Sequence, residues 1–112
     1  MPGKPVIFLV ATECAPELEE KFNNWYDETH IPMLLKSKWL QGVTRYKLAP
    51  VTQGEYPEYL AIYEFEDRQA FEAWFSGPEI HAAREEMQDT WADKAFERKW
   101  RVVYEPLKTW HK

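Results

Sequence analysis

Three side chains that can hold or move protons, Tyr26, Asp27 and His30, lie within five residues of one another. Residues three and four positions apart are neighbours on a helix, so we expect His30 to contact both Asp27 and Tyr26. A histidine titrates near neutral pH, and a neighbouring carboxylate or phenol can orient its ring. The spacing therefore predicts an acid/base cluster with His30, Asp27 and Tyr26 as catalytic residues. A simple surface or capping interaction of the histidine explains the same spacing equally well.

Apolar periodicity predicts the helix that would carry this cluster. Pro16 suits a first helical turn. The core-facing stripe recurs at spacings of three and four residues and consists of Leu18, Phe22, Trp25, Thr29 and Met33. Pro32 lacks an amide hydrogen and restricts the residue before it, so we expect the helix over residues 16–31 to end or kink beside His30. Unpaired carbonyl groups at such a helix end favour the protonated form of His30.

The remaining elements follow in an order typical of one fold. Apolar runs rich in β-branched and aromatic residues predict strands over residues 6–13, 43–48, 58–65 and 99–104. Two more helices are predicted over residues 68–75 and 78–94, the first capped by Asp67 and the second opened by Ser76 and Glu79 at capping-box spacing. The order β-α-β-β-α-β is the ferredoxin-like motif, an α+β fold with a four-stranded antiparallel sheet and both helices on one face.

Two of these strands, 6–13 and 58–65, carry apolar side chains on both faces. The helices of a ferredoxin-like fold cover one face only, so the other face needs a partner. The same face of a second subunit, related by a two-fold axis, is the simplest one. We therefore expect a homodimer formed through the sheet faces, whose two sheets enclose a barrel.

Composition limits the classes of function. The 112 residues predict a single domain over residues 1–112. The net charge of −5 argues against nucleic acid or an anionic membrane as partner. Cys14 is the single cysteine, and the N-terminus has no signal-peptide pattern, so we expect a cytoplasmic protein. Six residues each of Trp, Tyr and Phe call for a large core, an interface or a cavity to line.

The chain resembles the dimeric α+β barrel superfamily, and in particular its EthD-like branch. The resemblance covers the order of elements, and its most specific part is the run Phe22-x-x-Trp25-Tyr26-x-x-x-His30-Ile31-Pro32, followed by Gly42 and a strand containing Tyr46. It implies that His30 faces a pocket between sheet and helices. We expect the aromatic wall of this pocket to include Tyr26, and the substrate-binding residues to be Trp25, Tyr46, Tyr63 and Trp74.

Two functions from different classes remain open at this point. The first is a small-molecule enzyme without a tightly bound cofactor that uses histidine acid/base chemistry on a small aromatic or polyketide-like substrate. Isomerisation, cyclisation with dehydration and cofactor-free oxygenation would all be compatible. The alternative is a non-catalytic protein that binds a hydrophobic metabolite or assists a degradation or biosynthetic pathway. A zinc site built from His30 and His81 lacks the usual ligand spacing, so no metal is expected.

Overall fold

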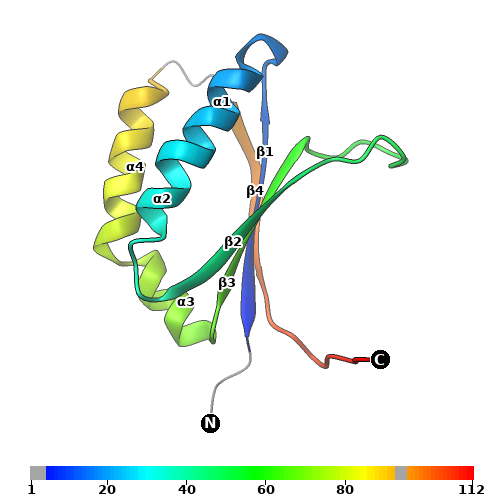
Figure 1. Ribbon diagram of the computed structural model, residues 1–112, viewed down its shortest axis with the longest axis vertical. Coiled ribbons are helices and arrows are strands. Elements are labelled where there is room, and N and C mark those ends of the chain that lie inside the picture. The colour runs from blue at the N-terminus through cyan, green and yellow to red at the C-terminus, as the bar shows by residue number, and fades with distance from the viewer. Residues whose placement is uncertain (1–4, 93–95) are drawn as a thin grey trace.

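The computed structural model describes residues 5–92 and 96–112, whose strands form an antiparallel sheet in the order β2-β3-β1-β4 (Figure 1). The strands are β1 (Val6–Cys14), β2 (Leu40–Lys47), β3 (Tyr59–Phe65) and β4 (Phe96–Tyr104). β1 pairs with β3 on one side and with β4 on the other. The first and last strands of the chain are therefore adjacent, as the ferredoxin-like order requires.

The helices of the described segments all pack on one face of this sheet (Figure 1). The first helical region runs through η1 (Pro16–Leu18), α1 (Glu19–Trp25), the π-helical turn η2 (Tyr26–His30) and α2 (Ile31–Leu34), and the second comprises α3 (Arg68–Phe75) and α4 (Pro78–Thr90). The predicted ferredoxin-like α+β fold is confirmed. None of the helices in the described segments is both long and apolar enough to cross a membrane.

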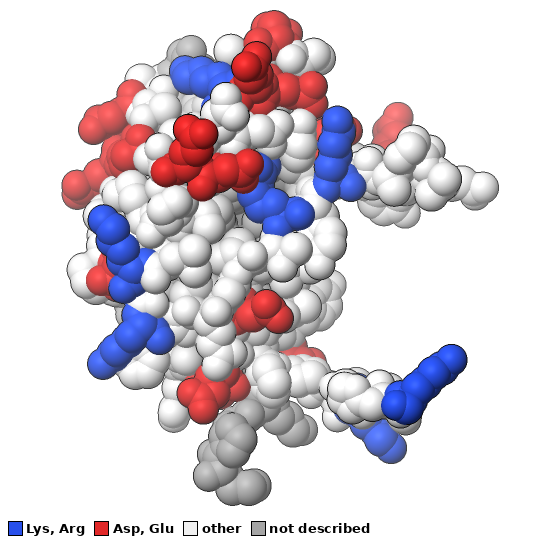
Figure 2. Space-filling model, in the orientation of Figure 1, with Lys and Arg blue, Asp and Glu red and all other residues white. Residues whose placement is uncertain are grey.

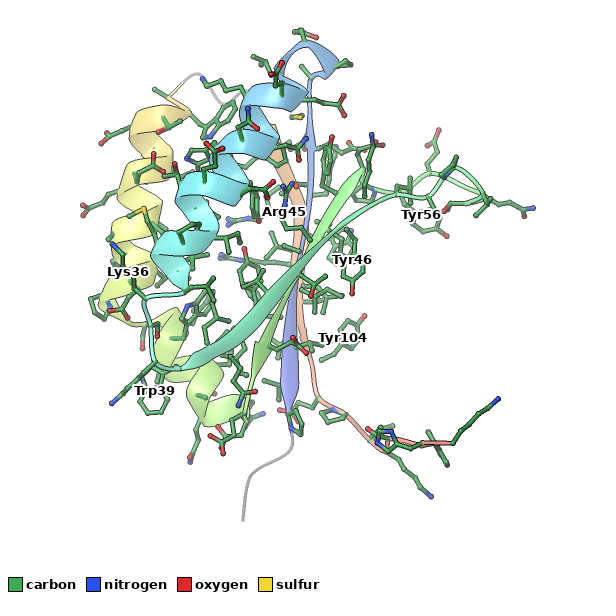
Figure 3. The ribbon with its side chains drawn as sticks, in the orientation of Figure 1. Lys36, Trp39, Arg45, Tyr46, Tyr56 and Tyr104 are labelled. Carbon is green, nitrogen blue, oxygen red and sulfur yellow. The ribbon has the colours of Figure 1, made fainter. Side chains whose placement is uncertain are left out.

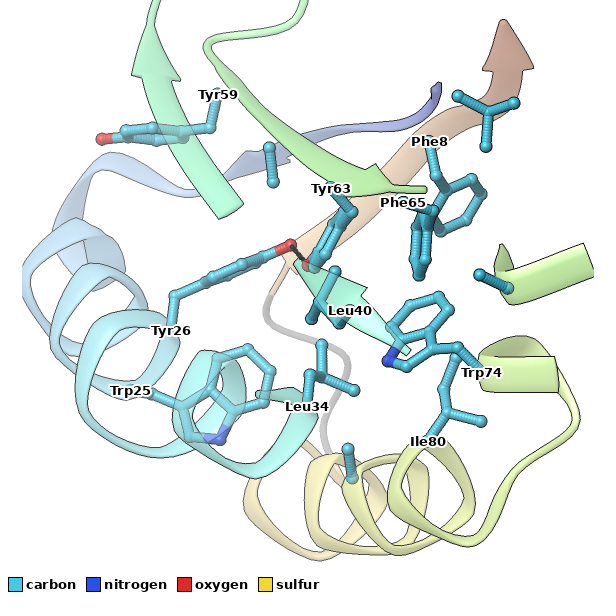
Figure 4. Packing of buried hydrophobic residues seen from close by; sticks show 14 of the residues in the cluster. Phe8, Trp25, Tyr26, Leu34, Leu40, Tyr59, Tyr63, Phe65, Trp74 and Ile80 are labelled. Atoms are coloured by element: carbon cyan, nitrogen blue, oxygen red, sulfur yellow. Dashed lines mark hydrogen bonds between the residues drawn. The ribbon is translucent and has the colours of Figure 1, made fainter. Parts of the chain in front are cut away.

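Aromatic rings pack between the helices and the sheet (Figure 4). Phe22, Tyr63, Phe65 and Trp74 are almost completely buried. The Phe65 ring centroid lies 5.1 Å from that of Trp74, and Phe22 and Tyr26 are 5.4 Å apart in an edge-to-face arrangement. Tilted and edge-on pairs of this kind add to the stabilisation from burial alone. Helices and sheet are thus joined by a continuous aromatic layer.

The opposite face of the sheet is apolar and has no helix over it. Leu9 lies beside Ile62 on one neighbouring strand and beside Val102 on the other. Figure 3 shows Tyr46 and Tyr104 on this open side, and both are at least half exposed. The strand pattern thus places apolar side chains on both faces, as expected.

Helix boundaries follow local chemistry, with one difference from the prediction. Asp67 caps α3 by accepting a hydrogen bond from the Ala70 amide at 2.8 Å. The expected capping pair at α4 is not formed, because the N-cap position is Gly77 and the Ser76 hydroxyl donates to the Glu72 carbonyl in the preceding helix. The predicted helix end at residue 94 lies outside the described residues.

Candidate active site

Pro32 changes the winding of the helix that carries His30 without ending it. Because residue 32 has no amide hydrogen, the usual α-helical bonding is interrupted there. The chain forms the π-helical turn η2, in which the Ile31 amide donates to the Tyr26 carbonyl five residues earlier. The helix then continues to Leu34. Of the two expected outcomes beside His30, an end or a kink, the end is not found, and the helix is instead interrupted by the π turn. Single π turns inside helices occur frequently at functional sites.

The π turn decides which side chains face His30. A π turn holds more residues than an α turn, so residues four apart stay aligned while residues three apart diverge. The Tyr26 and His30 rings accordingly meet edge to face, with centroids 5.0 Å apart. Asp27 is 60% exposed, and its Oδ1 lies 2.7 Å from Nη1 of Arg45. The expected pairing of Asp27 with His30 is therefore replaced by an ion pair between Asp27 and Arg45.

A pocket of about 660 Å³ lies between the helices and the covered face of the sheet. His30, Tyr26 and Trp25 from the first helical region line it, together with Tyr63 of β3 and Trp74 of α3. Figure 4 shows that the four aromatic side chains of this set surround a common space. The volume is within the range of small-molecule sites. The structure thus brings five of the seven predicted site residues to one pocket.

Burial keeps His30 neutral. Its ring stacks on Trp25 with a centroid separation of 4.7 Å, and Nδ1 is buried without a hydrogen-bond partner among the described residues. Burial is the main cause that lowers the pKa of His30 from 6.5 to about 4; Arg45 lowers it too, while Glu86 opposes the change. The expectation that a helix end would favour the protonated form is wrong, because the helix continues past His30 and burial disfavours the charged ring.

Two tyrosines form a buried hydrogen-bonded pair in the wall of the pocket. The hydroxyl oxygens of Tyr26 and Tyr63 are 3.2 Å apart (Figure 4). Burial raises the pKa of both phenols, and for Tyr63 the nearby Tyr26 raises it further. Both hydroxyls therefore stay protonated at neutral pH. Since one hydroxyl donates to the other, the second keeps its own hydrogen available for another acceptor.

Three buried nitrogen atoms that line this pocket have no hydrogen-bond partner among the described residues: His30 Nδ1, Trp74 Nε1 and Trp91 Nε1. The indole of Trp25 differs, since its Nε1 donates to Glu86 at 2.8 Å. Buried polar atoms without partners are rare in native proteins and call for an explanation. All three atoms belong to residues that line this one pocket.

Tyr46 lies away from this pocket. Successive residues of a strand point to opposite faces, and β2 directs Arg45 toward the helices and Tyr46 toward the open face (Figure 3). Tyr46 lines a second hollow on that face, with Trp100 and Tyr56. The structure therefore does not bring Tyr46 to the predicted aromatic wall.

The exposed position of Asp27 predicts a small effect of its removal. An Asp27→Asn variant is expected to lose less than about 1 kcal/mol of unfolding free energy, because exposed ion pairs contribute little. It should also leave the pKa of His30 unchanged, since the carboxylate points to Arg45. Urea unfolding and an NMR titration of His30 measure these quantities, with Glu58→Gln, which breaks another exposed pair with Lys47, as the control. A large change in the His30 titration would restore Asp27 to the acid/base cluster.

Arginines on the pocket wall were not predicted as a group. Arg84 comes from α4, and Arg98 and Arg101 come from β4. Strand alternation would place residues 98 and 101 on opposite faces. The register of β4 against β1 shifts between Ala11 and Thr12, and this irregularity puts both arginines on the helix side. No pattern in the sequence predicts this shift in the register of β4.

Metal-ligating side chains are not grouped in this site. Across residues 5–92 and 96–112, no three His, Cys, Asp or Glu side chains are placed to hold a metal ion together. His81 is exposed on α4, and Cys14 is half-buried at the end of β1. The polar groups that a ligand would meet are therefore the imidazole, the tyrosine pair, the two indole N–H groups and the arginines.

Comparison with solved structures relates this fold to several known proteins. An EthD family protein from Bacillus halodurans matches with a TM-score of 0.66 and 17% identity, covering 91% of this chain and 99% of that chain. SnoaB from Streptomyces nogalater, a cofactor-independent oxygenase, matches with a TM-score of 0.60 and 12% identity over 96% of this chain and 97% of its own. MhuD, solved with two manganese protoporphyrin IX molecules per active site, matches with a TM-score of 0.70 and 16% identity over 96% of this chain and 99% of its own.

At these identities the likeness concerns the fold alone, the ferredoxin-like fold. No curated protein matches the sequence. A family model does match, over residues 5–103, and therefore over both helical regions and all the strands described above. The chain belongs to this family, the domain of unknown function DUF4286.

Proposed function

We propose that the protein is an acid/base enzyme that acts on a small aromatic or polyketide-like molecule held in the 660 Å³ pocket. The observation that carries the proposal is that three residues lining one aromatic cavity, one of them a neutral histidine, have buried nitrogen atoms without hydrogen-bond partners among the described residues. Titratable groups perturbed by burial in a cavity are enriched at active sites. His30 is the proton carrier, and Tyr26 and Tyr63 are its partners in place of Asp27.

The residues fit a reaction that begins with enolisation. The neutral imidazole of His30 takes a proton from a carbon next to a carbonyl group. The electron pair of the broken C–H bond forms the C=C bond of the enolate, and the π pair of the C=O bond moves onto the oxygen. The free hydroxyl hydrogen of the Tyr26–Tyr63 pair donates to that oxygen, where negative charge develops. Isomerisation, cyclisation with dehydration and cofactor-free oxygenation can all start from such an enolate. The surrounding aromatic rings exclude water from the reacting centre.

Two structural neighbours support the proposal. SnoaB is a cofactor-independent oxygenase, and MhuD holds two manganese protoporphyrin IX molecules per active site. Related folds thus house both chemistry without a cofactor and large aromatic ligands. A shared fold does not transfer an activity, so the proposal rests on the side chains of this pocket.

Hydrogen–deuterium exchange tests the proton-transfer step without knowledge of the natural substrate. Aromatic ketones, beginning with α-tetralone, are incubated with the protein in deuterium oxide, and loss of the proton next to the carbonyl is followed by NMR. We expect exchange faster than in buffer. His30→Gln is expected to slow the enzymatic part by about a hundredfold or more, the usual contribution of a general base.

His81→Gln is the matched control, because His81 is exposed on α4 and does not line the pocket. This variant should catalyse hydrogen–deuterium exchange of the ketone at the same rate as the unmodified protein. Equal rates for His30→Gln and the unmodified protein would exclude His30 as the base. Binding of the ketones without any acceleration would favour the alternative function, a non-catalytic protein for a hydrophobic metabolite.

We also propose that the protein works as a homodimer through its open sheet face. β1 has nine residues, and four strands about 4.8 Å apart give a face of roughly 30 by 19 Å. A stable dimer buries roughly 800 Å² on each partner, somewhat more than this projected area. The loop 48–58 and the tail 105–112 extend beyond the sheet on the same side and supply the remainder (Figure 2). Their tips expose Val51, Leu107 and Trp110.

A further inference from the structure

Three arginines meet at the pocket beside the edge strand β4. Arg84, Arg98 and Arg101 all line the pocket that contains His30. Arg84 and Arg101 lie over the same ring, with guanidinium carbons 5.0 and 5.2 Å from the centroid of Phe75. Both guanidinium groups thus contact the same side chain, and all three arginines line one pocket although they come from a helix and a strand.

The irregularity in β4 builds this cluster. Arg101 is paired with Val10 and Arg98 with Thr12. In a regular antiparallel ladder the two arginines would be two residues apart, like Val10 and Thr12, but β4 contains one extra residue between them. Val10 and Thr12 both line the pocket. Without the shifted register, Arg98 would point to the open face. Bulges often re-aim a side chain next to an active site, and this one brings the second β4 arginine to the pocket.

The cluster lacks a carboxylate partner in the part of the chain that the structure describes. The ion pairs found there involve Arg45, Lys47, Arg68 and Lys99, and none involves the three pocket arginines. The chain has 19 acidic residues against 14 basic ones, so acidic side chains are not scarce. Glu86 is the carboxylate that raises the pKa of His30. It already accepts hydrogen bonds from Trp25 and Thr90. Among the described residues, no carboxylate forms an ion pair with the positive charge at the pocket.

Proximity of like charges has a measurable consequence. Burial lowers the pKa of Arg101, and the positive charges of Arg98 and Arg84 lower it further. An anion placed among the three guanidinium groups would relieve this repulsion and accept charge-assisted hydrogen bonds, often two from one arginine. The contacts of Arg84 and Arg101 with the Phe75 ring restrict both guanidinium groups before an anion binds.

We propose that the substrate of this pocket is an aromatic or polyketide-like carboxylic acid, whose carboxylate binds to Arg84, Arg98 and Arg101 while its carbonyl-bearing skeleton lies against the aromatic wall near His30. This inference rests on the proposed function for the identity of the pocket and adds the chemical class of the ligand. It assigns to the arginines a binding role that is separate from proton transfer.

A pair of probes that differ only in charge tests the assignment. The affinities of 2-naphthoate and the uncharged 2-naphthamide are measured by isothermal titration calorimetry at low and at moderate salt. We expect naphthoate to bind at least about tenfold more tightly, since hydrogen bonds to charged groups exceed neutral ones by roughly that factor. Added salt should weaken naphthoate binding and leave naphthamide binding unchanged.

Arginine variants locate the binding. Arg101→Gln and Arg84→Gln are each expected to weaken naphthoate binding about tenfold, with no change for naphthamide. Arg68→Gln is the matched control, because Arg68 is exposed on α3 and pairs with Glu72 and Glu105. Equal affinity for the two probes in the unmodified protein, or equal losses in Arg68→Gln and Arg101→Gln, would overturn the assignment.

Failure of this inference can be told apart from failure of the proposed function. His30→Gln is expected to keep the preference for naphthoate, because the preference depends on the arginines alone. A naphthoate preference without proton exchange supports the arginine site and removes the catalytic role of His30. Proton exchange by a protein that binds both probes equally keeps His30 as the base and removes the arginine site.

Discussion

An Ile62→Glu substitution is expected to convert the protein from a dimer to a monomer. Ile62 lies at the centre of the open face, beside Leu9 on β1 and opposite Thr44 on β2. Its side chain points away from the helices, so the aromatic core keeps its contacts and the subunit should still fold. In a dimer formed through this face, the carboxylate would be buried against apolar side chains of the other subunit without a cation to pair with it.

The cost of that buried charge sets the size of the effect. An uncompensated charge in an interface costs about 3–5 kcal/mol, which weakens association by more than a hundredfold. Analytical ultracentrifugation should show the unmodified protein at twice the mass of one chain and the variant at the mass of a single chain. Circular dichroism should show unchanged secondary structure in both.

Gln69→Glu is the control for this experiment. It introduces the same charge at an exposed position of α3, away from the open face, and should leave the protein dimeric. If Ile62→Glu remains a dimer, subunits associate through another surface. If the unmodified protein is already a monomer, the apolar open face needs a different partner.

The stability of the protein is expected to fall between pH 6.5 and pH 4 through His30. The pKa of His30 is lowered from 6.5 to about 4 in the folded protein, mainly by burial. In this window the unfolded chain binds a proton at His30 that the folded chain does not. The unfolded state is therefore stabilised relative to the folded state as pH decreases. The contribution of neutral His30 is fully present above about pH 6.5 and is lost toward pH 4.

The size of this effect follows from the two pKa values. A decrease from 6.5 to about 4 corresponds to roughly 3 kcal/mol of unfolding free energy, at about 1.4 kcal/mol for each pH unit. Urea unfolding at a series of pH values measures it. The His30→Gln variant should show a smaller loss over the same range, because glutamine does not titrate.

Two further observations make the pH experiment specific. Carboxylates also titrate toward pH 4 and change the unfolding free energy of both proteins. The effect of His30 is therefore measured as the difference in the loss of unfolding free energy between the unmodified protein and His30→Gln. His81→Gln, at an exposed position, should follow the unmodified protein. A direct NMR titration that finds His30 protonated at pH 6 would contradict the buried, neutral imidazole.

Local patterns in the sequence were sufficient for the elements and their order. The runs around Val6–Cys14 and Tyr59–Phe65 were identified as strands with two apolar faces, and the structure has both as neighbours in the sheet. Asp67 was identified as a cap because capping depends on residues only a few positions away. Trp25 and Trp74 line the pocket, and helical periodicity had placed both on the inward side of their helices. Tyr26 lines it too, an expectation that came from the family resemblance.

Tertiary structure decided the chemistry of the site. Spacing alone predicted that Asp27 pairs with His30. The π turn beside Pro32 instead directs the two side chains apart, and the Asp27 carboxylate forms an ion pair with Arg45 of β2. The position of His30 along its helix suggested a protonated ring, whereas its burial against Trp25, which depends on how the whole chain packs, favours the neutral one.

The sequence by itself therefore determined the ferredoxin-like order of elements, because this order depends on short-range periodicity. The family resemblance, and not the periodicity, implied an inward position for His30. The tertiary structure alone decided which groups share the pocket with it. Tyr63 meets Tyr26 through contact between β3 and the first helical region, and Arg98 joins Arg101 through a shift in register between β1 and β4. Such contacts join residues far apart in the chain, and their geometry is set by the packing of the sheet and helices as a whole.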